Sequence, residues 1–137
     1  MGWPLFGLVR VRGSLLATLV TLLGVGASMP SSAQAPSGAA ANGQVIFESR
    51  CGACHSLDAH RVGPELGTVM GRAAGKAPGF GYSPALRLAR HVWDRDKLLA
   101  WLSDPESVVP GQAMGYRLEQ DKDRRDVVAY LASVPKP

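Results

Sequence analysis

The stretch Cys51-Gly52-Ala53-Cys54-His55 contains both cysteines of the chain and decides how the rest of the sequence is interpreted. The two cysteines are three residues apart, so on a turn of helix their thiols lie on the same side. Two thiols placed in this way can form thioethers with the two vinyl groups of one haem, and the histidine that follows can bind its iron. The motif therefore predicts one haem c, covalently attached through Cys51 and Cys54, with His55 as an iron ligand.

Three other uses of this motif are open at this point. A thioredoxin-like redox pair would need strands that alternate with helices, and the sequence shows no convincing strand pattern. A zinc site would need a fourth ligand, and His60 and His91 do not form a pair at the usual zinc-ligand spacing. A disulfide between the two cysteines would close only a very small loop. Among these uses we favour haem attachment.

The first 35 residues are typical of a secretory signal peptide. Arg10 and Arg12 precede the uncharged apolar run GSLLATLVTLLGVGA (13–27), and a polar stretch then ends in Ala33-Gln34-Ala35. The apolar run is shorter than the roughly 20 residues that a membrane span needs, and the small residues at its end are typical of a cleavage site. We expect cleavage after Ala35 and export to the periplasm of a Gram-negative bacterium. An uncleaved membrane anchor is the alternative.

Length and charge narrow the classes of function. A chain of 137 residues, of which 46% are hydrophobic and 19% charged, is long enough for one small folded domain and too short for a two-domain enzyme. The formal charge of +4 would permit a nucleic-acid partner. Because Arg10 and Arg12 are the only charged side chains in residues 1–35, their removal lowers this charge to +2. We therefore expect no nucleic-acid partner.

The remaining sequence predicts an all-α fold of about four short helices and long loops. We expect a flexible segment over 36–42 and a folded domain over 43–137. The helix signals are an N-cap residue at Asn42, helix starts at Ser83-Pro84, Asp94 and Asp121, and apolar residues that follow at helical spacing. They place helices at about 42–52, 84–90, 94–102 and 121–133. Six glycines between Gly63 and Gly81 indicate an open loop whose backbone passes close to a flat group.

Two methionines after the predicted cleavage site could supply a second iron ligand. Met70 lies in the glycine-rich loop, and Met114 ends the turn-rich stretch PGQAM (110–114) between two helices. Either could instead fill an apolar gap, and His60 and His91 are the alternative ligands. A Met/His pair raises the haem potential and leaves no open iron site, which favours electron transfer over oxygen chemistry. We expect Met114 to be the ligand.

The chain resembles the class I cytochromes c over residues 42–134, including the mitochondrial type and short soluble bacterial relatives. Separated motifs occur in the family's order around the haem motif. They are Gly43 and Phe47, GPELGTVMGRAAGKAPGFGYS (63–83), Trp93, Asp104-Pro105, PGQAM (110–114) and RRDVVAYL (124–131). The resemblance implies a cytochrome c fold wrapped around one haem and a one-electron carrier without catalysis of its own. It also implies that Gly43, Phe47 and Tyr130 form the crossing of the first and last helices.

The resemblance implies further roles for residues around the haem. Pro64 should accept a hydrogen bond from His55, which orients the ring. Arg72, Tyr82 and Trp93 should surround the haem propionates, whose burial needs hydrogen-bond donors.

The chain departs from the family pattern near the second ligand. Trp101 stands where the family usually has a tyrosine whose hydroxyl reaches the methionine sulfur. Gln112 and Ala113 replace a Thr-Lys pair before Met114, and the loop after His55 is about three residues shorter than usual. An indole can donate only through its N–H, so the reduction potential cannot be transferred from the family.

Redox proteins are the partners that the resemblance implies. We expect a monomer that makes transient contacts at the membrane surface with a donor and an acceptor, such as membrane oxidoreductase complexes or a dehydrogenase. A haem subunit fixed to an exported dehydrogenase complex is the alternative, and a ligand-binding haem protein would need an open iron site. The lysines after residue 35 are few and scattered, at Lys76, Lys97, Lys122 and Lys136.

Overall fold

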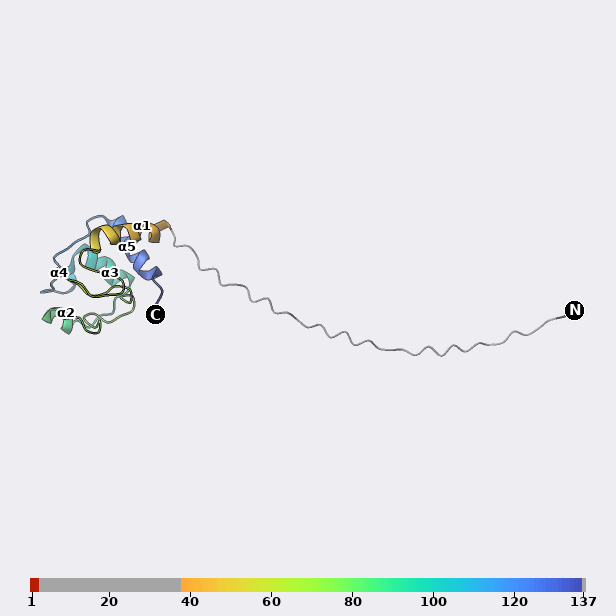
Figure 1. The fold of residues 1–137 in the computed structure, drawn as a ribbon, viewed down its shortest axis with the longest axis horizontal. Helices are drawn as coiled ribbons and strands as arrows, with labels where there is room; N and C mark the ends of the chain where they lie inside the picture. Colours follow the sequence, from red (N-terminus) through yellow and green to blue (C-terminus); the bar gives the residue numbers. More distant parts are fainter. Residues whose placement is uncertain (3–37, 137) are drawn as a thin grey trace. The chain divides into compact units, whose positions relative to one another are not determined.

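The chain folds into helices joined by long loops, and the predicted all-α architecture is confirmed (Figure 1). A computed structural model describes residues 1–2 and 38–136. The predicted signal peptide and its cleavage site therefore lie outside the described residues, apart from Met1 and Gly2. Within the described ranges, every helix is too short or too polar to cross a membrane.

The first and last helices pack side by side (Figure 1). Helix α1 (Gly38–Ile46) continues into a π-helical turn, η1 (Phe47–Cys51), and α5 (Asp121–Ser133) lies against α1. A Cβ added at Gly43 would overlap the carbonyl oxygen of Asp126 and lie 2.8 Å from Cβ of Tyr130. The rings of Phe47 and Tyr130 are 5.6 Å apart between centroids. These contacts confirm the expected crossing, which only a residue without a side chain allows.

Helix α1 begins earlier than the sequence pattern predicts. Residues 38–42, which that pattern assigns to a flexible segment, are helical, and Asn42 lies inside the helix and is not its N-cap. Two causes, one local and one tertiary, extend the helix to residue 38. The segment GAAA (38–41) contains three alanines, which favour helix, and Ala40 is buried with 2% of its surface exposed.

Three shorter helices lie between the two ends of the chain. Ser83 caps α2 (Pro84–Leu88) by accepting from the Leu86 N–H, and Asp94 caps α3 (Arg95–Ser103) by accepting from the Lys97 N–H. Both caps agree with the predicted helix starts. Asp104-Pro105, interpreted in the sequence as a helix end, also starts a single turn, α4 (Pro105–Val108), because proline suits the first helical position.

The glycine-rich stretch between residues 63 and 81 is a loop without helix, as predicted. It is held by a short antiparallel pairing of Ala73 with Val92. Gly75 has a φ of +67°, and a Cβ there would lie 2.8 Å from the carbonyl carbon of Leu86. The loop therefore passes closely against α2, and a larger residue at Gly75 would push the two apart.

Part of the hydrophobic core lies where α3 meets α5. Leu98 and Leu102 of α3 and Val128 and Leu131 of α5 are all buried. Trp101, on the same side of α3, is also buried. The inner faces of these helices thus form one wall of the space described next.

Candidate haem site

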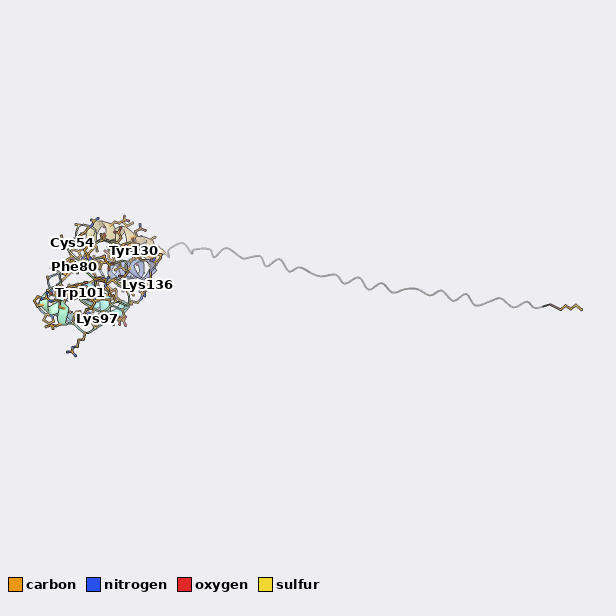
Figure 2. The ribbon with its side chains drawn as sticks, turned by 60° about the horizontal axis from the view of Figure 1, so that its bottom comes forward. Cys54, Phe80, Lys97, Trp101, Tyr130 and Lys136 are labelled. Carbon is orange, nitrogen blue, oxygen red and sulfur yellow. The ribbon has the colours of Figure 1, made fainter. Side chains whose placement is uncertain are left out.

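A cavity of about 330 Å³ lies inside the fold, with mostly apolar walls from η1, α2, α3, α5 and the loops between them. All the residues predicted to hold the cofactor or its iron line this one cavity. They are Cys51, Cys54, His55, Pro64, Arg72, Tyr82, Trp93, Trp101 and Met114. Trp101 is buried, whereas Cys54 is exposed; both are labelled in Figure 2. The fold thus brings together residues that are spread from position 51 to position 114 of the sequence.

Cys51 and Cys54 lie on one tight turn at the end of η1. The Cys51 carbonyl accepts from the Cys54 N–H at 3.0 Å and from the His55 N–H at 2.8 Å. Both thiols are free, which argues against the disulfide alternative. Burial, followed by the charge of Cys54, raises the pKa of the Cys51 thiol to about 11, so unmodified Cys51 is a neutral thiol at pH 7.

The His55 ring has one fixed orientation. Its Nδ1 lies 2.8 Å from the Pro64 carbonyl oxygen. A carbonyl can only accept, so Nδ1 carries the proton and Nε2 keeps a free lone pair for a metal. A Cβ at Gly63 would overlap Cε1 of the ring and lie 2.7 Å from Nδ1. The glycine therefore gives the ring the space that this hydrogen bond needs.

Met114 is held by its sulfur and by its backbone. Trp101 donates from Nε1 to the Met114 sulfur at 3.3 Å, and the Met114 N–H donates to the side-chain oxygen of Gln112. The Glu106 carboxylate in turn accepts from the Gly111 N–H at 2.8 Å and from the Gln112 amide at 3.3 Å. These bonds hold the loop that carries the sulfur. Sequence reasoning missed Glu106, which offers no signal besides its place next to Pro105.

Three cavity-lining residues with polar donors, Arg72, Tyr82 and Trp93, make up the polar part of the cavity wall. The Nε of Arg72 is buried and has no hydrogen-bond partner among the described residues. The Tyr82 hydroxyl accepts from the Ala77 N–H at 3.3 Å, which leaves its own O–H to donate. Trp93 is buried, with its ring against Trp101 at 5.1 Å. An apolar cavity lined by the unpartnered Nε of Arg72 and by a Tyr82 O–H that can still donate fits a haem, which is a flat apolar ring with two carboxylates.

The alternative iron ligands lie elsewhere in the described part of the chain. Met70 packs against the hydrophobic core and does not line the cavity. His60 uses both ring nitrogens, since Nδ1 accepts from the Glu65 N–H and Nε2 donates to the Pro78 carbonyl. His91 packs its ring against Trp93, away from the cavity lining. Burial, followed by the charge of Lys97, lowers its pKa.

Apolar residues complete the cavity wall. The helical spacing of Leu98 and Leu102 predicts a buried helix face, but it does not show that this face borders a cavity. Phe80, Val69 and Leu131 also line it. Helical spacing places Leu131 on the inner side of the last predicted helix, whereas Val69 and Phe80 lie in the glycine-rich loop, where no periodicity identifies inward-facing residues.

Comparison with known proteins agrees with this geometry. Residues 40–135 match the family model described as Cytochrome c. Cytochrome c of Chlamydomonas reinhardtii is 37% identical, over 75% of this chain and 96% of its own length. Cytochrome c2 of Rhodopseudomonas palustris is 36% identical, over 69% of this chain and 97% of its own. Among solved structures, cytochrome cH from Methylobacterium extorquens has a TM-score of 0.65 and 39% identity, covering 68% of this chain and 96% of that one.

Proposed function

Because the chain belongs to the cytochrome c family, whose members carry one covalently bound haem c, we propose that it is an exported monohaem carrier of single electrons. We propose that thioethers form at Cys51 and Cys54 and that His55 and Met114 bind the iron. The observation that carries this proposal is the His55 ring. Its Nδ1 proton is committed to Pro64, 2.8 Å away, which frees Nε2 for a metal at the cavity wall.

The role of the protein follows from the chemistry of its ligands. The haem supplies one-electron exchange between ferrous and ferric iron, and the protein supplies binding, orientation and electrostatics. His55 and Met114 would hold the iron in both oxidation states, so little rearrangement would accompany electron transfer. The apolar wall around Trp101 and Leu98 excludes water from the ring. With His55 and Met114 as its iron ligands, the bound haem would have no open position for a substrate, so the chain would act as a carrier without catalysis of its own.

The haem carboxylates are assigned to the polar part of the cavity wall. Arg72 Nε, the Tyr82 O–H and the indole of Trp93 are the donors available there. Their hydrogen bonds offset the cost of burying the carboxylates, which would otherwise be several kcal/mol in an apolar setting (about 2–7 kcal/mol for a polar group without a partner).

We propose that the carrier works in the periplasm, after removal of residues 1–35, in a respiratory or other periplasmic electron-transfer chain. The N-terminal sequence and the cytochrome c2 and cytochrome cH relatives, both from bacteria, support this assignment. Redox proteins at the membrane surface would be its partners, in short-lived contacts by a monomer.

One purification tests processing, cofactor and ligation together. The native protein is released from the periplasm, and its mass and absorption spectrum are recorded. The expected result is a mass equal to residues 36–137 plus one haem, with a spectrum typical of His/Met ligation. A protein without haem would overturn the assignment, and an intact N-terminus would overturn the processing.

Two further measurements separate the alternatives. Gel filtration of the native protein should give a monomer, whereas co-elution with a dehydrogenase would identify a fixed subunit of that complex. Carbon monoxide should not bind the reduced protein at neutral pH, because Met114 occupies the sixth position. Ready binding would favour a ligand-binding haem protein.

A further inference from the structure

Glu65 forms an ion pair with Arg72, which lines the polar part of the cavity wall. The Glu65 carboxylate accepts from Nη1 of Arg72, and the Glu65 carbonyl accepts from Nη2 at 2.8 Å. Thr68 completes the arrangement. Its hydroxyl accepts from Arg72 Nη1 at 2.7 Å and donates to the same carboxylate at 3.0 Å. One residue, Glu65, thus binds the guanidinium through both its side chain and its backbone.

This ion pair is largely withdrawn from water. The side chains of Arg72 and Glu65 expose 12% and 15% of their surface. A pair at this depth is screened far less by solvent and salt than a surface pair. The charge of Glu65 therefore acts on Arg72 and on whatever fills the cavity beside it.

The pair leaves one guanidinium nitrogen for the cofactor. Both Nη atoms donate to Glu65 or Thr68, while Nε is buried without a partner in the described structure. Arg72 itself lines the cavity. Glu65 thus binds both Nη atoms of Arg72, and these bonds oppose a rotation of the Arg72 side chain that would move Nε away from the cavity.

We propose that Glu65 is a positioning residue for the haem. It orients Arg72 towards a haem carboxylate and cancels most of its charge, and so it lowers the reduction potential of the protein. This inference rests on the proposed function, in which Arg72 serves a haem propionate. The sign follows from charge. Ferric haem carries one more positive charge than ferrous haem, so a nearby carboxylate favours the ferric state and a nearby uncompensated arginine favours the ferrous state.

The direct test is Glu65→Gln in the haem-loaded protein, with the reduction potential as the readout. Glutamine keeps the size of the side chain, an acceptor oxygen and the backbone bond to Nη2, but removes the charge. We expect the equilibrium with a fixed redox partner to shift about tenfold towards the reduced protein. For one electron this corresponds to a rise of about 59 mV in the reduction potential. A potential that stays the same or falls would overturn the proposal.

Glu119→Gln is the matched control. It removes the same formal charge from an exposed position in the loop before α5. Since solvent screens a charge there, the equilibrium should shift less than about twofold. If Glu119→Gln and Glu65→Gln shift the potential equally, the effect is one of net charge, and the specific role of Glu65 is wrong.

A second comparison keeps the test decisive if Glu65→Gln does not fold. In the Arg72→Gln background, adding Glu65→Gln leaves a neutral pair of nearly the same size in place of an unpaired buried carboxylate. The double variant should have a higher potential than Arg72→Gln alone, and equal potentials would overturn the proposal.

The spectrum of each sample reports ligation separately. An unchanged His/Met spectrum without a shift refutes only the role of Glu65, whereas absence of haem from the wild type refutes the proposed function.

Discussion

Trp101 donates its indole N–H to the sulfur of Met114, with 3.3 Å between Nε1 and Sδ. The donor is buried and cannot turn to water instead. A hydrogen bond to the sulfur withdraws electron density from the atom that we assign to the iron, which disfavours the electron-poor ferric state. The contact therefore couples a buried position on α3 to the redox properties of a loop residue 13 positions later.

Replacing Trp101 by phenylalanine should lower the reduction potential, because the variant keeps an aromatic ring but loses the donor. The change should be small, equivalent to less than about 1 kcal/mol, since thioether sulfur is a weak acceptor. Potentiometric titration measures it. Trp101→Tyr is the control, because its O–H can restore a donor. A potential in Trp101→Phe that equals or exceeds the wild-type value would contradict this account.

Replacing Met114 by alanine should abolish the absorbance band of the iron–methionine bond and let carbon monoxide bind the reduced protein. Met70→Ala is the matched control, because Met70 packs against the core and does not line the cavity. Both substitutions remove the same side chain, but only one should change the spectrum. An unchanged band in Met114→Ala would remove this residue from the site.

Replacing Gly43 by alanine should destabilise the fold by about 1–3 kcal/mol, the usual cost of overpacking. The added Cβ would overlap the backbone of Asp126 and force α1 away from α5. In the same helix, a Cβ at Gly38 meets no atom within 4 Å, so Gly38→Ala should be neutral or slightly stabilising. Urea unfolding measures both variants. Equal stabilities would show that the helix crossing tolerates a side chain at Gly43.

The contribution of Glu65 to stability should depend on pH. Burial raises the pKa of its carboxyl, but the hydrogen bonds of Thr68 and the charge of Arg72 outweigh burial, so the folded pKa lies below its usual value. The unfolded state therefore takes up the proton first as the pH falls. The stabilisation is complete above the ordinary glutamate pKa of about 4.3 and is lost as the pH falls through the lower folded value.

Unfolding of the wild type and Glu65→Gln at a series of pH values measures this contribution. Their difference in free energy of unfolding should be constant near neutral pH and should shrink below about pH 4. A difference that stays constant into acid would show that the Glu65 carboxyl is not linked to folding.

Replacing His60 by phenylalanine should destabilise the fold by about 1 kcal/mol or somewhat more. The imidazole joins two loops, since Nδ1 accepts from the Glu65 N–H at 3.0 Å and Nε2 donates to the Pro78 carbonyl at 2.8 Å. Phenylalanine keeps the ring contact with Phe80 but makes neither bond. His60→Ala removes the ring as well and should be less stable still. A His60→Phe protein as stable as the wild type would show that the ring contact alone holds the loops.

Much of the fold could be predicted because its signals are local. The caps at Ser83 and Asp94 place the starts of α2 and α3, and the apolar spacing over 121–133 places α5 within its observed bounds. The sequence pattern predicts the start of α1 too late. There, helix formation depends on the burial of Ala40 as well as on the local run of alanines.

By itself, the sequence determined the attachment motif at Cys51–His55 and the all-α class, since each depends on the spacing of residues that are neighbours in the chain. Through the resemblance it also indicated which distant side chains to expect around one haem. Only the tertiary structure decided how Glu65 binds Arg72, how Glu106 supports the loop of Met114, and that Met114 and not Met70 lines the cavity. Those relationships depend on backbone paths through loops that carry no periodicity, where direction is set by hydrogen bonds and packing between segments distant in sequence.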